Sequence, residues 1–182
     1  MVIGVTPYDR RKKENVFGKG DSMKNDIRDY LGKEFLFYDG GTGTYLQSRG
    51  LPPGELPESW NITHRETILQ MHKSFLEAGS NILLANTFGA NDAKLAGTGY
   101  DLRTIITAGV ENAREAIRQY RAGSGRLDGD GLEAAGADRT RPLFVSMDIG
   151  PSGHLMEPYG DLSFDHEYEW FRQAAVYGEQ AG

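Results

Sequence analysis

Three short apolar runs in the chain each end in a cluster of Gly and polar residues. The runs lie near residues 35–39, 81–86 and 142–148, and each is followed by a segment with helical spacing of apolar residues. Apolar runs of this length that alternate with helical segments are typical of parallel strands in β-α units. Ligands of such folds bind outside the carboxyl ends of the strands, where all three polar clusters fall. The pattern therefore predicts both an α/β fold and the position of a site.

The helices between the runs are predicted from apolar residues three and four positions apart. A helix near 65–78 is expected to begin after a capping box formed by Thr63 and Glu66, and to end at Gly79 in the C′ position. A second helix near 102–120 carries the most regular apolar stripe of the chain.

The third helix is expected near 164–180, with Ser163 as its N-cap. Its buried face is expected to comprise Phe164, Tyr168, Phe171 and Ala175. Three β-α units form an open sheet, whereas a closed (β/α)8 barrel takes about 250 residues. The fold expected of these 182 residues is a partial (β/α)8 TIM barrel, with about three β-α units and the later units missing.

Polar segments separate these elements. Residues 1–20 are predicted to be a disordered leader, and 21–32 a short helix. Residues 122–141 are rich in Gly, Asp and Ala and are predicted to be a flexible insertion before the third strand. One domain, 21–182, is therefore expected.

Composition excludes several classes of function. The formal net charge of −6 argues against a nucleic-acid surface, and no stretch has the length of a membrane span or the form of a secretory signal. The chain has no cysteine, and His64 and His72 are too far apart for the usual zinc pairing. We therefore predict a cytoplasmic protein without nucleic-acid or membrane partners and without metal ligands of its own.

The first strand end offers a candidate binding site. Asp39 is followed by Gly40 and Gly41, so a carboxylate suited to a ligand ammonium precedes backbone N–H groups that a ligand carboxylate can approach. Together they would fit the two ends of an amino acid. The alternative is a turn in which Asp39 bonds nearby backbone, and the spacing alone leaves both open. A phosphate loop is disfavoured because Leu46 stands where the third Gly is needed.

The second strand end offers an amide, a hydroxyl and an aromatic wall in Asn86, Thr87 and Phe88. The alternative is a capped strand-to-helix turn. Ser152 lies in a sequence similar to a nucleophile elbow, but the final Gly of that motif is missing. No catalytic residue is therefore assigned.

Five segments, taken in order, resemble the homocysteine S-methyltransferase family, and most of all the homocysteine domain of its cobalamin-dependent methionine synthases. The segments are Asp39 to Gln47, Glu58 to Asn61, His72 with Ala78 and Gly79, Asn86 to Gly89, and Ile149 to Gly153. The resemblance runs from about residue 31 to 182, with an interruption at 122–141.

The resemblance implies a (β/α)8 barrel that binds homocysteine and a zinc ion at the mouth of the barrel. It implies that Asp39 holds the substrate amino group and that the amides of Gly40 and Gly41 hold its carboxylate. It also implies that the same pocket is lined by Asn86, Thr87 and Phe88. The zinc ligands of the family are cysteines from later strands, which this chain lacks. The chain is thus expected to be the N-terminal half of the homocysteine-binding domain, inactive by itself.

The implied reaction is methyl transfer to the zinc-activated thiol of homocysteine, which yields methionine. Zinc deprotonates the thiol, and the amino-acid clamp orients it. The donor is methylcobalamin bound by other domains, betaine or S-methylmethionine, and the expected partners are homocysteine, a C-terminal half and cobalamin or folate domains. Two alternatives stay open: a stand-alone half barrel that binds an amino acid or pairs with another subunit, and an unrelated β/α enzyme acting on a small amino acid.

Overall fold

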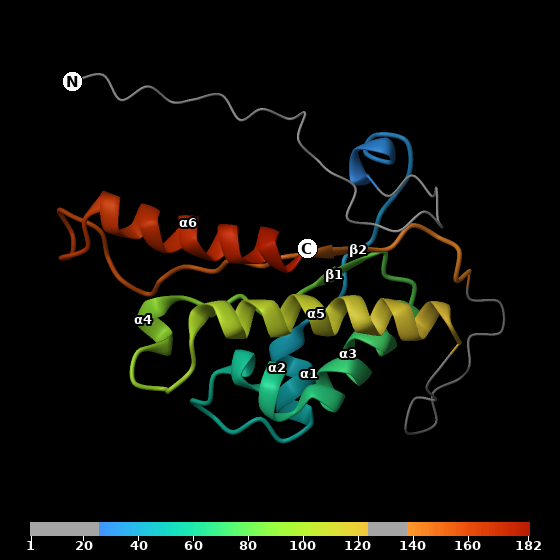
Figure 1. Ribbon diagram of the computed structural model, residues 1–182, viewed down its shortest axis with the longest axis horizontal. Helices are drawn as coiled ribbons and strands as arrows, with labels where there is room; N and C mark the ends of the chain where they lie inside the picture. The colour runs from blue at the N-terminus through green and yellow to red at the C-terminus, as the bar shows by residue number, and fades with distance from the viewer. Residues whose placement is uncertain (1–25, 124–137) are drawn as a thin grey trace.

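The computed structural model describes residues 26–123 and 138–182, and in this part helices and strands alternate (Figure 1). In chain order the elements are η1 Ile27–Asp29, α1 Thr42–Ser48, η2 Pro57–Ser59, α2 Trp60–Thr63, α3 Arg65–Glu77, β1 Ile82–Leu84, α4 Asp92–Leu95, α5 Leu102–Arg121, β2 Phe144–Ser146 and α6 Phe164–Ala181. The predicted α/β class is confirmed, as are the three long helices.

The sheet is small and parallel. Strands β1 and β2 pair with Ile82 opposite Phe144 and Leu84 opposite Ser146. Tyr38 makes an isolated parallel bridge with Ile82 on the other edge of β1. The predicted parallel order of the three apolar runs is therefore confirmed.

The first apolar run does not form the strand predicted at 35–39. The bridge at Tyr38 is supported by Asp39 N–H donating to the Ile82 carbonyl at 3.0 Å and by Ile82 N–H donating to the Phe37 carbonyl at 3.0 Å. Phe35 is 91% exposed. Among the described residues the run pairs with a single strand, β1, so it gains neither a second ladder nor a buried face that would extend it.

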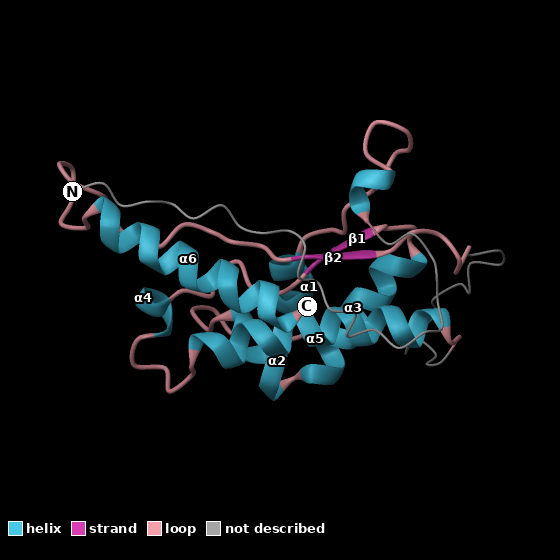
Figure 2. Cartoon of the chain, turned by 45° about the horizontal axis from the view of Figure 1, so that its top comes forward, coloured by secondary structure: helices cyan, strands magenta, loops and turns pink. Residues whose placement is uncertain are grey.

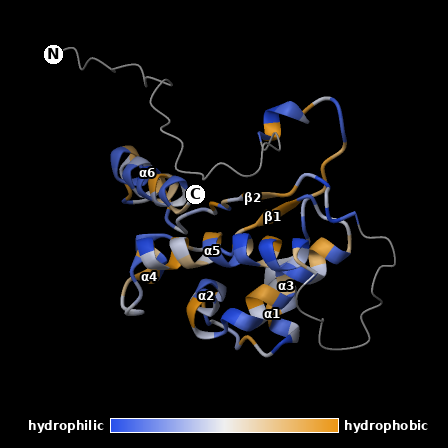
Figure 3. Cartoon of the chain, turned by 45° about the vertical axis from the view of Figure 1, so that its right-hand side comes forward, coloured by the Kyte–Doolittle hydropathy of each residue, from blue (hydrophilic) through white to orange (hydrophobic). Residues whose placement is uncertain are grey.

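The helices α3 and α5 cover one face of the sheet, and η1 lies on the opposite side (Figures 1 and 2). In Figure 3 the strands, and the turns of α3 that face them, carry the colour of hydrophobic residues. The cluster between α3, α5 and the sheet comprises Leu76, Leu83, Ala113, Tyr120 and Leu143. A second cluster joins α1, α2 and α3, and a third joins α4, α5 and α6.

The predicted end of α3 is confirmed. Gly79 has φ of +108°, a value that favours glycine, and its N–H donates to the Leu76 carbonyl at 3.0 Å. The Ser80 N–H donates to the Phe75 carbonyl at 3.1 Å, which completes a Schellman motif. This stop turns the chain directly into β1.

The capping box predicted for α3 is not formed, although the helix begins at Arg65 as predicted. Thr63 belongs to α2, and its hydroxyl donates to the Ser59 carbonyl at 3.2 Å instead of capping α3. His64 occupies the N-cap position, but its side chain makes no capping hydrogen bond to the helix, and Glu66 is exposed. The short helix before α3, absent from the prediction, takes up the residue expected to cap.

The N-cap of α6 is confirmed, but its buried face is not. Ser163 Oγ accepts from the His166 N–H at 3.3 Å. Phe164 is 69% exposed, Tyr168 and Phe171 are exposed as well, and Ala174 is the buried residue. Ala174 packs against α5 and the partly buried Tyr177 packs against the same cluster, while Phe164, Tyr168 and Phe171 stay exposed.

Other predicted segments are only partly described. The leader 1–20 lies outside the described residues, and of the helix predicted at 21–32 the described part contains only the short η1. Most of the insertion predicted at 122–141 also lies outside them. At its described end, Arg141 Nη1 donates to the Tyr120 hydroxyl at 2.6 Å, so this end is anchored on α5.

Candidate functional site

The carboxylate of Asp39 lies at the end of the first apolar run, beside β1. Its Oδ2 accepts from the Leu84 N–H at 3.0 Å, which holds the side chain against the carboxyl end of the strand. Its Oδ1 is buried and has no hydrogen-bond partner among the described residues. One oxygen is therefore used by the fold, and the other accepts no hydrogen bond from the described residues.

The pKa of Asp39 is raised to about 6, first because burial disfavours the charged carboxylate and further because Asp148 adds a like charge. The Leu84 N–H acts in the opposite direction. A cation placed at this strand end would relieve both the desolvation and the repulsion. Asp39 and Asp148 thus make the strand ends locally attractive to an ammonium group.

Gly40 and Gly41 lead from Asp39 into α1. Within residues 26–123 and 138–182 their N–H groups have no acceptor. A Cβ on Gly40 would lie 2.8 Å from Cε1 of Phe75, so the chain passes close to α3 at this point. Gly41 is the N-cap residue of α1, where no side chain caps the helix.

Thr87 joins the ends of β1 and β2. Its Oγ1 donates to the Asp148 carbonyl at 2.8 Å, and the Asp148 N–H lies 3.2 Å from the same oxygen. Thr87 is fully buried, so its hydroxyl serves the backbone of the neighbouring strand end. This link sets where Asp148 stands relative to Asp39.

The amide of Asn86 points into the fold. Its Nδ2 donates to the Pro57 carbonyl at 2.8 Å and to Asn61 Oδ1 at 3.1 Å, while Asn61 Nδ2 donates to the Asn86 carbonyl at 2.8 Å. Both donor hydrogens of Asn86 are therefore occupied beneath the strand end. The Asn86 side chain therefore lies beneath the candidate site, whereas Asp39 lies at the site itself.

Phe88 lies at the surface of the strand end, and its ring is accessible. The residue is 53% exposed, and Lys94 Nζ lies 5.9 Å from the ring centroid. Its carbonyl accepts from the Gly150 N–H at 2.9 Å. Of the three predicted residues after β1, Phe88 is the one whose side chain a ligand can reach.

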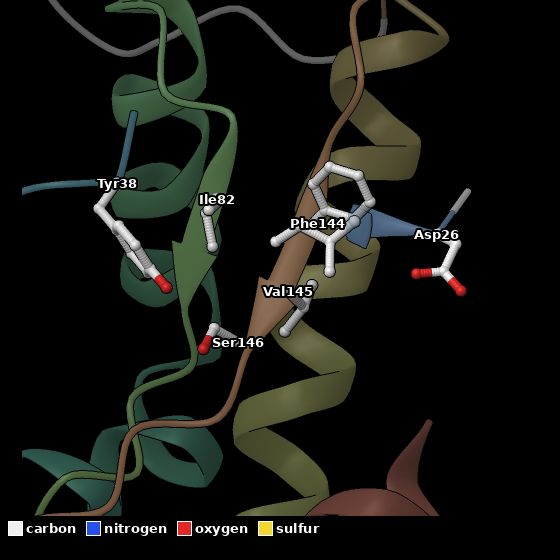
Figure 4. A pocket seen from close by; sticks show the side chains of 7 residues that line it. Asp26, Tyr38, Ile82, Phe144, Val145 and Ser146 are labelled. Carbon is white, nitrogen blue, oxygen red and sulfur yellow. The ribbon is translucent and has the colours of Figure 1, made fainter. Parts of the chain in front are cut away.

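A separate cavity of about 450 Å³ lies on the strands themselves (Figure 4). It is lined by Asp26, Ile27, Tyr38, Ile82, Phe144, Val145 and Ser146. None of the six predicted site residues lines it. We place the candidate site at the strand ends and not in this cavity, because the Asp39 oxygen and the Gly40 and Gly41 amides, which lack partners among the described residues, lie there.

Metal ligands are not provided by the part of the chain that the structure describes. No group of three or more His, Asp or Glu residues there has the arrangement to hold an ion, and the sequence has no cysteine. None of the described helices is long and apolar enough to cross a membrane.

The fold and the candidate site define a class: a parallel β-α protein with its candidate ligand site at the carboxyl ends of its strands. The sequence profile of the family described as homocysteine S-methyltransferase matches residues 36–182. The chain belongs to this family.

Curated relatives and solved structures agree with this assignment. Betaine–homocysteine S-methyltransferase 1 of Pongo abelii is 33% identical over 130 residues, which cover 70% of this chain and 31% of the relative. The Danio rerio protein of the same name is 33% identical over 118 residues, 62% of this chain and 27% of that relative. The chain thus spans about a third of the length of these relatives.

Among solved structures, the metallated form of the homocysteine methyltransferase MmuM from Escherichia coli has a TM-score of 0.66 at 22% identity, covering 86% of this chain and 54% of that one. Its oxidised form gives 0.65 at 24% identity, covering 86% and 53%. Likeness at this identity concerns the fold. The predicted family is confirmed, whereas the particular likeness to methionine synthase is not.

Sequence reasoning missed two residues that shape this region. Glu58 accepts from the Gly89 N–H at 2.5 Å, and Asn61 exchanges hydrogen bonds with Asn86. Both lie in a segment noted for its resemblance to the family but given no role. Asp148 ends the third apolar run, and its proximity to Asp39 became apparent only from the fold.

Proposed function

We propose that this chain carries the amino-acid clamp of a homocysteine S-methyltransferase. In this proposal the three β-α units are the N-terminal part of a (β/α)8 barrel, and homocysteine binds at the carboxyl ends of the strands. Methyl transfer to the homocysteine thiol yields methionine. The observation that carries the proposal is the buried, unpartnered Oδ1 of Asp39 at a strand end, in a chain of this family.

The substrate ammonium would bind Asp39 Oδ1, with Asp148 as the second negative charge nearby. An ammonium group donates to the open oxygen and offsets the burial and the repulsion that raise the pKa of Asp39. The N–H groups of Gly40 and Gly41 would receive the substrate carboxylate. Phe88 would form an apolar wall for the side chain of the substrate.

Asn86 and Thr87 would act from beneath the pocket. Asn86 holds the strand end to η2 through the Pro57 carbonyl, and Thr87 holds the end of β2 through Asp148. That Asn86 and Thr87 belong to the substrate pocket stays a prediction. These contacts favour an indirect role, in which the two residues hold the backbone of the pocket.

The zinc that the family resemblance implies does not fit the residues present here. The chain has no thiolate ligand, and the described residues hold no cluster of three candidate ligands. We therefore derive no step through a metal from this chain and propose that any activating ligands come from outside residues 1–182. By the same reasoning the isolated chain is inactive.

The methyl donor stays a prediction. The curated relatives described above are named for betaine, which gives no support to methylcobalamin or to cobalamin domains as partners. The residues that would clamp homocysteine are the same whichever donor is used, so the clamp can be tested without it.

The test is to measure homocysteine binding by NMR for the wild-type chain and for the variant Asp39→Asn. A buried charge pair that loses one partner costs about 2–5 kcal/mol, and an exposed pair only about 0–1 kcal/mol. Asp39 is half-buried, so we expect affinity to fall by about tenfold, equivalent to about 1.4 kcal/mol. Asp161→Asn removes the same charge from an exposed loop and serves as the matched control.

The pH dependence gives a second arm. Because the pKa of Asp39 is about 6, the carboxylate needed for binding is lost as the pH falls below that value, and wild-type affinity should weaken there. Equal homocysteine affinity of the Asp39→Asn and Asp161→Asn variants would mean that Asp39 is only a turn residue.

A further inference from the structure

Glu58 is a buried carboxylate with an unusual environment. It lies in η2 and is 3% exposed. Its Oε1 accepts from the Gly89 N–H at 2.5 Å, while its Oε2 is buried and finds no partner in the described part of the chain. Burial of a carboxylate is unfavourable unless hydrogen bonds or a cation compensate it, and only one Glu58 oxygen has a partner among the described residues, so this contact calls for an explanation.

The contact constrains the chain at Gly89. A Cβ at this residue would lie 2.8 Å from Oε1 and 3.0 Å from Oε2 of Glu58. Any side chain at position 89 would therefore push the carboxylate away. Glu58 and Gly89 fit each other, and the hydrogen bond draws the turn after β1 down onto η2.

The same turn is held from the other side by the end of β2. The Gly150 N–H donates to the Phe88 carbonyl at 2.9 Å, and a Cβ on Gly150 would lie 2.5 Å from that oxygen. The peptide between Phe88 and Gly89 is thus bonded through its N–H to Glu58 and through its carbonyl to Gly150. Its orientation decides where the Phe88 ring points.

We propose that Glu58 is a positioning residue for the pocket wall formed by Phe88. This inference rests on the function proposed above, in which Phe88 contacts the homocysteine side chain. Glu58 does not touch the substrate. It orients the Phe88–Gly89 peptide, and through the Phe88 carbonyl it keeps the end of β2 in register with the end of β1.

A general structural role is separable from this one. Glu55 lies in the same corner, and its Oε1 accepts from Ser59 Oγ at 3.1 Å and from Trp60 Nε1 at 3.0 Å. Glu55→Ala therefore removes a carboxylate from η2 and its surroundings without altering the Gly89 contact. It is the matched control for Glu58→Ala.

The experiment follows the amide signals of Gly89 and Gly150 by NMR in the 182-residue chain, together with homocysteine affinity and thermal stability. In Glu58→Ala we expect both signals to shift, and affinity to fall by about tenfold, or about 1.4 kcal/mol. Glu58→Gln keeps an oxygen that accepts a weaker, neutral hydrogen bond, so it should restore affinity to within about threefold of the wild type. Glu55→Ala should change thermal stability only.

The outcomes are distinct. A shift confined to Gly89 with unchanged affinity overturns the inference, as does equal loss of affinity in Glu55→Ala and Glu58→Ala. Should Glu58→Ala not fold, Glu58→Gln decides, since a weaker bond must still move both amide signals. If the wild type does not bind homocysteine, the proposed function fails, and the Gly150 signal alone then shows whether Glu58 orients Phe88.

Discussion

His72 is expected to make the chain sensitive to acid. The residue lies in α3, one helical turn from Ile68 and from Leu76, and all three are fully buried. Neither ring nitrogen has a hydrogen-bond partner among the residues described. Burial without a partner lowers the pKa of His72 from 6.5 to about 4, so the folded chain keeps this imidazole neutral.

The sign and size follow from proton linkage. Between pH 6.5 and about 4 the unfolded chain binds a proton at His72 that the folded chain does not, so the free energy of unfolding decreases as the pH falls. The loss approaches about 3 kcal/mol at pH 4 and is about 2 kcal/mol at pH 5. Total stabilities of single domains are about 5–15 kcal/mol, so this loss is large.

Asp39 acts in the opposite direction over part of this range. Its pKa is raised from 3.8 to about 6, so the folded chain holds a proton there that the unfolded chain has released, and this contribution is lost as the pH rises through 6. Asp39 is half-buried and His72 is not exposed at all, so solvent screens the effect of Asp39 more. We expect the His72 effect to prevail.

The assay is urea unfolding at pH 7 and pH 5 for the wild type and His72→Leu. The variant has no titrating ring and loses no hydrogen bond seen in the structure, so its midpoint should change less with pH. His166→Leu, at an exposed site on α6, controls for the loss of a histidine. The reasoning fails if wild type and His72→Leu lose the same stability between pH 7 and pH 5.

Three further substitutions test the backbone geometry of the fold. Gly79→Ala should lower the free energy of unfolding by about 1 kcal/mol or more, because Gly79 has a φ of +108°. Gly43→Ala should raise the free energy of unfolding by about 0.5–1 kcal/mol, because Gly43 lies in α1 with open space around it. Equal urea midpoints for the two variants would contradict this. Thr87→Val removes the hydroxyl that bonds both backbone groups of Asp148 and should destabilise by about 1–3 kcal/mol; calorimetry showing no change would mean that this link is not needed.

Local signals explain which parts of the fold were predictable. Ser163 and Gly79 act within one helical turn of the ends they define, so their spacing in the sequence was sufficient. The capping box at Thr63 satisfied the same kind of rule and was wrong, because α2 occupies the residues just before α3. A competing local structure of four residues leaves little trace in hydrophobic spacing.

The candidate site was predictable to the extent that it depends on strand order. Asp39 and Thr87 were placed at neighbouring strand ends because parallel strands bring their carboxyl ends together. Glu58 could not be placed, since its partner Gly89 is 31 residues away and the pair meets only when η2 packs under the strand end. Contacts of this kind depend on tertiary packing, which spacing does not encode.

The two errors about burial have one physical cause. Phe35 belongs to the run predicted as a strand, Phe164 was expected on the buried face of α6, and both are exposed. The first lies on an edge with a single neighbouring strand, and the second lies on the side of α6 away from α5. Parallel sheets normally have both faces and their neighbouring strands covered. These exposed aromatic residues therefore favour the proposal that further β-α units pack beside them.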